Sequence, residues 1–359
     1  MLRRLYNTNR ERLAEVLLDK ALPDRNEVPL NDCVTFFKGI FESASPPDDM
    51  PMNEKSSMEL TSNSHDITHY IDRGKIEKAM STLPKNTSPG ADSVAVALLR
   101  QIPVPALLNL FNLWLHYQNV PTKFKECRTI LLPKCSPVAG PDDYRPITIS
   151  SLIYRLFAKI LNQRLSLITE LNKRQKAFIR GTDGCGENAY LLKTVLAIAR
   201  REHRELCIAS LDIAKAFDSV SHHSVLRALA RQNADPRTVT LVKNLLADSS
   251  TRIEHSDGIS DLIMMMRGVK QGDPLSPLLF SLVVDELADE LDCSNVGFTV
   301  APNTSLCSLV FSDDILVLSD CKAGLQSQLL QVFQGSEPQC QCWQMFHVET
   351  LSGAEEAIC

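Results

Sequence analysis

The chain is 359 residues long, with 44% hydrophobic residues, 23% charged residues and a formal net charge of −5. This is the composition of a globular protein, and the length permits one large or two modest domains. No apolar run approaches the ~20 residues of a membrane span, and the N-terminal charges precede no apolar signal core, so we expect an intracellular protein without a membrane partner. The 11 cysteines are scattered, which favours reduced thiols over a disulfide framework.

The negative net charge conceals a basic middle region. Residues 123–204 contain 16 Lys and Arg against 7 Asp and Glu, a local net charge of +9. A basic surface of this kind is compatible with phosphate contacts, but a Lys/Arg-rich helical segment is usually a solvated face. Charge alone therefore supports nucleic-acid binding only weakly.

The first 64 residues are interpreted as an N-terminal extension and linker. Residues 9–20 and 32–41 have apolar residues at helical spacing, whereas residues 43–64 are rich in Pro, Ser and Met and show little periodicity. We therefore expect the main domain to begin near His65.

Helices are predicted over residues 71–80 and 105–117, the second with the spacing of a core helix. Between them, residues 83–92 form a turn-rich loop. Its lysine and glycine suit an approach to phosphate, but a surface loop joining two helices explains this segment better when it is taken alone.

Two strands are predicted over residues 127–134 and 142–149, joined by a turn-rich segment. The first ends in Lys134 and the second is entered through Arg145. This hairpin can hold both cations over a triphosphate, the Lys as a mobile point charge and the Arg as a bidentate ligand. A pair of exposed surface cations is nearly as good an interpretation of this segment.

Two further helices are predicted over residues 152–167 and 188–201. The segment between them contains a basic string, 175–181, and a glycine-rich string, 182–188. It suits a template groove, and it equally suits a basic loop in which Thr182 or Asp183 caps the following helix.

An apolar strand beginning at Leu206 delivers Asp212 at its end. The chain then turns toward a helix near Ser221, and Asp218 is interpreted as a helix cap in preference to a catalytic group.

Residues 249–266 are a predicted strand hairpin, followed by a loop with two glycines and two prolines. The loop leads into an apolar helix that starts at Ser276. Its position at a helix N-terminus can bring its backbone and Gln271 close to a base pair or a sugar.

The clearest chemical signal is Asp313-Asp314, which lies between two apolar runs of strand length. Adjacent carboxylates at the tip of such a hairpin repel each other and are costly to desolvate unless a cation neutralises them. Together with Asp212 from another strand, they supply the hard oxygen ligands that Mg²⁺ takes in a two-metal phosphoryl-transfer site.

Seven short strings are informative when they are taken together in their order along the chain. They are Ser88 to Asp92, Leu132 to Lys134, Tyr144 to Ile147, Gln175 to Phe178, Asp212 to Asp218, Gln271 to Phe280 and Phe311 to Asp314. Over roughly residues 65–330 the chain resembles the reverse transcriptase domain of non-LTR (LINE-type) retrotransposons. The strings 177–179 and 183–188 resemble the branch whose full-length members carry a restriction-like endonuclease.

The resemblance implies a role for each matching residue. Asp212 and Asp313 would bind two catalytic Mg²⁺ (or Mn²⁺) ions, with Asp314 as a supporting carboxylate and the carbonyl of Ile213 as a further ligand. Phe217 matches the aromatic residue that excludes a ribose 2′-hydroxyl and so selects deoxynucleotides.

The remaining matches concern the nucleotide and the template. Gln271 and Gly272 match the loop that contacts the incoming nucleotide and the template, and Lys134 and Arg145 match the residues that hold the triphosphate.

The resemblance also implies an α+β fold: the fingers and palm of a right-hand polymerase, with an antiparallel palm sheet backed by helices. We expect this domain over residues 65–335 and an aberrant, disordered tail over residues 336–359. The family has a further palm strand, a primer-gripping hairpin and a helical thumb at this point, and we expect the thumb to be absent. A zinc site from three tail cysteines and His347 is an alternative, but the one-residue gap between the first two thiols is shorter than usual.

The expected activity is that of an RNA-directed DNA polymerase, a nucleotidyltransferase that uses an RNA template, a DNA primer and dNTPs. We expect little activity from this chain alone, for want of a thumb. The alternative is a non-catalytic RNA-binding remnant of a decayed element, and a two-metal cyclase fits the paired aspartates but not the Gln271 loop. The family implies nuclear action, although the sequence contains no clear localisation signal and does not indicate an oligomeric state.

Overall fold

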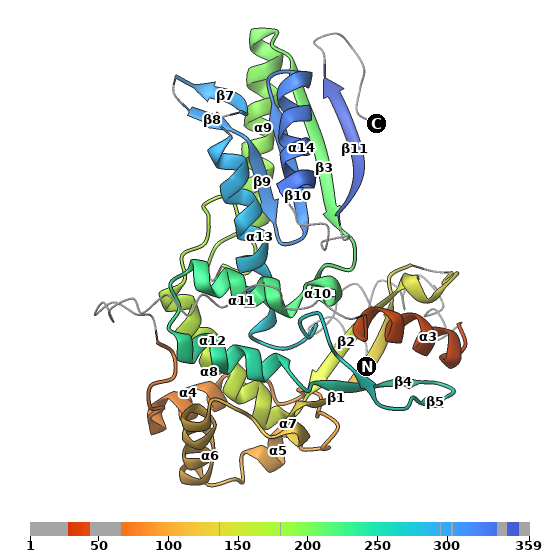
Figure 1. Cartoon of the computed structure of the whole chain (residues 1–359), viewed down its shortest axis with the longest axis vertical. Helices are drawn as coiled ribbons and strands as arrows, with labels where there is room; N and C mark the ends of the chain where they lie inside the picture. The colour runs from red at the N-terminus through yellow and green to blue at the C-terminus, as the bar shows by residue number, and fades with distance from the viewer. Residues whose placement is uncertain are drawn as a thin grey trace, which may run out of the picture.

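The computed structural model describes residues 28–43 and residues 66–335 apart from 136, 180, 295 and 303, together with residues 343–351; for 333–335 and 343–351 it describes the backbone alone. The described strands form a four-stranded sheet, a five-stranded sheet and a two-stranded hairpin. In Figure 1 the four-stranded sheet and its helices lie at the top, the five-stranded sheet lies at the lower right and a group of helices lies at the bottom. No helix in these ranges combines the length and the apolar character needed to cross a membrane.

The helical group at the bottom of Figure 1 is built on aromatic packing. The ring of Phe111 lies 5.4 Å from that of Trp114 and 5.3 Å from that of Phe157. The helices are α4 (Arg73–Ser81), α5 (Val96–Leu99), α6 (Val104–Tyr117), α7 (Thr122–Lys125), α8 (Leu152–Ile168) and α12 (Pro236–Leu246). The helices predicted over 71–80, 105–117 and 152–167 are thereby confirmed to within two residues at each end.

The five-stranded sheet contains the predicted Lys134/Arg145 hairpin. Its strands are β1 (Glu126–Pro133), β2 (Tyr144–Ser150), β4 (Ser250–His255), β5 (Gly258–Ile259) and β6 (Ile263–Met264). Strand β1 pairs antiparallel with β2, where Leu132 faces Arg145, and parallel with β4. The hydroxyl of Thr129 lies 3.0 Å from that of Thr148 and 2.8 Å from that of Thr251, which ties the three strands together inside the protein.

Helix α3 (Leu30–Phe41) packs on this sheet. The buried side chains of Phe37 and Phe41 form one apolar cluster with Leu131, Tyr144 and other residues of the sheet. Residues 28–43 are therefore part of the folded body, although the sequence placed them in an extension and linker. The helix predicted over 32–41 is present, but an amphipathic helix does not reveal which surface it packs against.

The four-stranded sheet is antiparallel, in the order β11-β3-β10-β9. Its strands are β3 (Leu206–Ile213), β9 (Ser308–Phe311), β10 (Asp314–Ser319) and β11 (Trp343–Leu351). Helices α9 (Gly184–Glu202), α13 (Ser276–Cys293) and α14 (Lys322–Gly335) lie alongside this sheet in Figure 1. A small hairpin, β7 (Phe298–Ala301) and β8 (Thr304–Leu306), extends from its edge.

Strand β11 corrects the prediction of a disordered tail over 336–359 for residues 343–351, and the rest of that range lies outside the described residues. The strand pairs with β3 along almost its full length, so the sheet does have a strand after α14. The register shifts between Met345 and His347, and this irregularity breaks the period-two alternation by which a strand is recognised in sequence. The cysteines of the alternative zinc site, Cys340, Cys342 and Cys359, lie outside the described residues.

Two short helices follow β3 and connect it to α12: α10 (Ala216–Ser219) and α11 (His222–Arg231). All eight cysteines whose side chains are described are free thiols. Helices packed on sheets, with no βαβ repeat among the described residues, give the α+β architecture that the resemblance implied.

Candidate active site

The aspartate pair lies at the tip of a hairpin, as predicted. Strand β9 ends at Phe311 and β10 begins at Asp314, so Ser312 and Asp313 form the turn between them. Asp314 lies directly opposite Asp212 on the neighbouring strand β3. Because side chains directly opposite each other project from the same face of a sheet, the fold brings together the carboxylates that the sequence separates by about 100 residues.

The three carboxylates influence one another electrostatically. The pKa of Asp314 is raised first by desolvation, then by the charge of Asp313 and then by that of Asp212. Like charges on opposed strands are destabilising, and a bound cation would remove this cost.

The donor set fits a divalent metal, because it consists of carboxylate oxygens with a backbone carbonyl nearby. Among the residues with described side chains, no group of three His, Cys, Asp or Glu residues is arranged so that it could hold a metal ion by itself. A metal at the carboxylates would thus need further oxygen ligands, such as those of a substrate phosphate or of water.

A cavity of about 740 Å³ opens over these carboxylates. Every residue that the sequence predicted for the site lines it: Lys134, Arg145, Asp212, Ile213, Phe217, Gln271, Gly272, Asp313 and Asp314. The five-stranded sheet supplies the two cations and the four-stranded sheet supplies the carboxylates. The cavity therefore lies where the two sheets meet.

The two cations enter the cavity from neighbouring strands. Lys134 follows the end of β1 and donates from Nζ to the carbonyl of Asp142 at 2.9 Å, and Arg145 is the second residue of β2. Both side chains are exposed. They are well placed to meet a polyanion that approaches from solvent, because their charges remain hydrated until it arrives.

An aromatic stack forms one wall of the cavity. The ring of Phe217 lies nearly parallel to that of the fully buried Phe280, 4.7 Å away, and Phe178 packs edge-on against Phe217 at 6.3 Å. Phe178 is 57% exposed and has a positive φ of 59°. Phe217 is thus supported from behind by Phe280 and cannot easily withdraw from the cavity.

Asp218 corrects the prediction that it caps a helix. It lies within α10, and the cap of α11 is Ser221, whose side chain accepts a hydrogen bond from the backbone N–H of Ser224. The buried carboxylate of Asp218 instead accepts a hydrogen bond of 2.7 Å from Nε2 of Gln271. Burial raises the pKa of Asp218 to about 7, partly offset by this hydrogen bond and by Lys134 and Lys215.

The loop that carries Gln271 is held against β2. The backbone carbonyl of Gln271 accepts a hydrogen bond of 2.8 Å from the N–H of Thr148 in β2. The next residue, Gly272, has a φ of +117°, and a Cβ there would lie 2.8 Å from the carbonyl oxygen of Thr148. Both the backbone angle and the close approach therefore require glycine at this position.

Two predicted strings do not reach the cavity. In the loop 83–92, a Cβ on Gly90 would lie 2.6 Å from the backbone of Ser150 and Ser151, so this glycine serves close packing and not phosphate binding. In the glycine-rich string, Asp183 caps α9 by accepting a hydrogen bond from Gly186, and the glycines form the first turn of the helix. The helix-capping interpretation of this string is correct.

Several residues that line the cavity were not predicted, and two of them contact each other. Phe36 of α3 lines the cavity, and Nζ of Lys215 lies 4.1 Å from the centre of its ring. Lys215 itself belongs to the string 212–218, but no pattern links it to a helix about 180 residues earlier. Only the packing of α3 beside α10 reveals this contact.

Known proteins resemble this chain over most of the described region. A family model described as reverse transcriptase (RNA-dependent DNA polymerase) matches residues 132–337. The Pol polyprotein of the type-1 retrotransposable element R2 from Popillia japonica is 38% identical over 69% of this chain and 35% of that protein. That of the type-2 element R2DM from Drosophila melanogaster is 35% identical over 68% of this chain and 23% of that protein.

The chain thus spans about a third or less of the length of these relatives. A structure of apo telomerase from Candida tropicalis aligns with 69% of this chain and 50% of that chain, at 12% identity and a TM-score of 0.46. The family model alone covers more than half of the chain and includes both cations and all three carboxylates. The chain therefore belongs to the reverse transcriptase family, as the domain of a non-LTR retrotransposon.

Proposed function

We propose that the chain is the fingers and palm of an RNA-directed DNA polymerase that adds deoxynucleotides to a primer on an RNA template. One observation carries the proposal: three carboxylates, two exposed cations and a supported aromatic side chain line a single cavity of about 740 Å³. Members of the family generally use a nucleic-acid template, nucleotide substrates and a divalent metal.

The cations and the aromatic wall would bind the nucleotide. Lys134 and Arg145 would hold the triphosphate: both side chains are exposed, and Nζ of Lys134 has further N–H donors besides the one given to the carbonyl of Asp142. Phe217 would lie under the sugar, where its fixed ring leaves no space for a 2′-hydroxyl. Gln271 would contact the nucleotide or the template, with its amide oriented by Asp218.

The carboxylates would hold the metal. Asp212, Asp313 and Asp314, with the carbonyl of Ile213, are the residues that would bind Mg²⁺ (or Mn²⁺). When bound, the metal would supply positive charge for activating the primer 3′-hydroxyl and for the departing pyrophosphate. We also propose that the element belongs to the branch with a restriction-like endonuclease, on the resemblance of residues 177–179 and 183–188.

The proposal is tested by primer extension on an RNA template with Mg²⁺ and dNTPs. Asp313→Asn should lower incorporation by about 100-fold or more, because it removes an anionic ligand from the metal site. Asp320→Asn is the matched control: it changes an exposed aspartate that follows β10 and does not line the cavity. If neither the wild type nor Asp313→Asn synthesises DNA, and both bind RNA equally well, the result would instead favour a non-catalytic RNA-binding remnant.

A further inference from the structure

A segment far from the catalytic hairpin in sequence runs along its outer edge. Residues 172–177 precede α9, and Gln175 forms a parallel bridge with Val310 of β9. The N–H of Lys176 donates to the carbonyl of Val310 at 3.1 Å, and the N–H of Val310 donates to the carbonyl of Arg174 at 3.3 Å. The segment therefore extends the four-stranded sheet beyond β9, beside the aspartate pair.

The side chain of Gln175 reaches the turn itself. Its Oε1 accepts a hydrogen bond of 3.0 Å from the N–H of Ser312 and another of 3.0 Å from the N–H of Ala177. Gln175 is completely buried. Because both neighbours are N–H donors, the amide oxygen must face them, and this fixes the orientation of the amide.

The turn that Gln175 contacts is strained. Ser312 has a φ of +59°, in the left-handed region that residues with a Cβ rarely adopt, and it immediately precedes Asp313. A change in the backbone angles of Ser312 would reorient Asp313 and shift the start of β10, where Asp314 faces Asp212. An external hydrogen bond at Ser312 therefore helps to set the placement of Asp313 and Asp314 relative to Asp212.

We propose that Gln175 is a positioning residue for the catalytic turn, which it holds in its left-handed conformation through the Ser312 N–H. This inference rests on the proposed function, since it assigns the residue that sets the geometry of the proposed metal ligands. Gln175 acts through Ser312 and does not line the cavity.

Stability alone is a poor explanation for a glutamine here. Its Nε2 is buried and has no hydrogen-bond partner among the described residues. An unpaired buried N–H is costly, whereas an apolar side chain of similar shape would avoid that cost. What the glutamine provides, and a methionine would not, is the oxygen directed at the turn.

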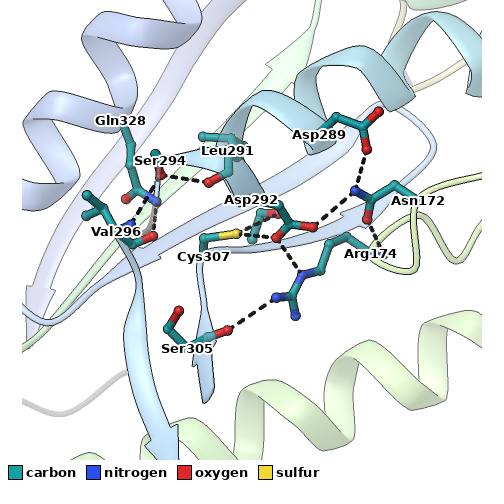
Figure 2. Close-up of polar contacts among 11 residues, drawn as sticks. Asn172, Arg174, Asp289, Leu291, Asp292, Ser294, Val296, Ser305, Cys307 and Gln328 are labelled. Atoms are coloured by element: carbon teal, nitrogen blue, oxygen red, sulfur yellow. Dashed lines mark hydrogen bonds and ion pairs between the residues drawn. The ribbon is translucent and has the colours of Figure 1, made fainter. Parts of the chain in front are cut away.

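The segment is anchored firmly enough to act as a reference point. Figure 2 shows Asn172 and Arg174 bound to the end of α13. Nδ2 of Asn172 donates to Asp289 at 2.8 Å and to Asp292 at 3.0 Å, and Nε of Arg174 donates to Asp292 at 3.1 Å. The thiol of Cys307, just before β9, lies 2.9 Å from the same Asp292 carboxylate.

This carboxylate therefore joins the segment, the helix and the strand at one point. The pKa of Asp292 is lowered: desolvation opposes this, but hydrogen bonds from Cys307 and Asn172 and the charge of Arg174 outweigh it. The carboxylate of Asp292 thus stays ionised and keeps its hydrogen-bond partners. These contacts fix the beginning of the segment 172–177, and so they fix the position from which Gln175 reaches Ser312.

The test compares two buried glutamines. Gln175→Met removes the acceptor while keeping an unbranched side chain of similar length. Gln328→Met is the matched control, because Gln328 is equally buried and its Nε2 donates to the carbonyl of Val296, away from the cavity (Figure 2). Three quantities are measured on the full chain: amide hydrogen exchange over residues 308–316, Mn²⁺ affinity by calorimetry, and single-nucleotide addition.

Gln175→Met should speed exchange of the Ser312 N–H by about 10-fold or more and weaken Mn²⁺ binding. It should lower kcat by about 10- to 100-fold with KM for the dNTP nearly unchanged, because misplaced ligands affect the reaction more than nucleotide binding. Gln328→Met should leave all three quantities near their wild-type values. Equal exchange at Ser312 in the wild type and Gln175→Met would overturn the proposal.

A second pair of variants covers the case in which Gln175→Met does not fold. Gln175→Glu keeps acceptor oxygens at the same reach, and Gln175→Asn withdraws the acceptor by one methylene. Slow Ser312 exchange in the first and fast exchange in the second would support the proposal, and equal rates would reject it. If the wild type adds no nucleotide, the proposed function fails, whereas exchange and Mn²⁺ binding still decide the role of Gln175.

Discussion

Among single residues, Asp218 should make the stability of the folded state depend on pH. It is buried beside the cavity, and burial raises its pKa from 3.8 to about 7. Between these two values the folded state retains a proton that the unfolded state has released. The contribution of Asp218 to the free energy of unfolding must therefore fall as the pH rises from about 4 to about 7, and it levels off above that range.

Asp218→Asn should remove this loss, because an asparagine has no proton to release and its Oδ1 can still accept from Gln271. We expect the free energy of unfolding of the variant to exceed that of the wild type by on the order of 2–4 kcal/mol at pH 8 and by little at pH 4. Urea denaturation across this pH range, without metal, measures the difference. A gap that stays constant with pH, or that also appears in the exposed-site variant Asp320→Asn, would contradict the assignment.

The role of a site residue could be predicted from the sequence where apolar strands flank it. The role of a residue that depends on contacts with distant parts of the chain could not. Asp313 and Asp314 are conspicuous because paired charges in an apolar setting need a reason, and Asp212 ends a strand. Asp218 and Gln175 carry no such local sign. Their partners lie 53 and 137 positions away, and only the folded chain brings them together.

Among the elements, the loop before α13 depends on one glycine. Gly272→Ala would place a methyl group 2.8 Å from the carbonyl oxygen of Thr148 at a φ of +117°. Because the obstacle is backbone, the loop itself must move, and we expect a loss of about 2–4 kcal/mol in stability and a higher KM for the dNTP.

Gly39→Ala is the control for this prediction. Gly39 lies inside α3, and a Cβ there meets nothing within 4 Å. Alanine is the better helix former, so this variant should gain about 0.5–1 kcal/mol. Thermal unfolding and steady-state kinetics of both variants test the contrast. Equal behaviour of the two variants would show that the loop has more freedom than its packing indicates.

Elements with a complete local signal were predicted well. The hairpins β1–β2 and β9–β10 and the helix at Ser276 each have an apolar pattern bounded by turn residues. Strand β11 was missed because its irregular register breaks that pattern. The packing of α3 on the five-stranded sheet was not predicted, because an amphipathic pattern shows which face of a helix is buried but not which surface covers that face.

For the whole molecule, α3 joins the beginning of the described chain to the five-stranded sheet. Phe37 is 2% exposed and lies in one apolar cluster with residues of β1, β2 and β4. Phe37→Ala should therefore cost about 3–5 kcal/mol, as removal of a large buried ring usually does.

The matched control is Tyr117→Ala, which removes an aromatic ring that is 71% exposed and should change stability by no more than about 0.5 kcal/mol. Denaturant unfolding of the full chain measures both variants. An equally small effect of Phe37→Ala would mean that the helix is dispensable for the fold.

The position of β3 has a consequence for how the protein is made. Both of its hydrogen-bonded neighbours, β10 and β11, follow it in the chain, the nearer after about 100 residues. At a synthesis rate of ~5–20 residues per second, β3 leaves the ribosome roughly 5–20 s before either neighbour exists. For that time an apolar strand with two unpaired edges must be kept from joining another chain, so the nascent protein should depend on a chaperone at this stage more than its finished form does.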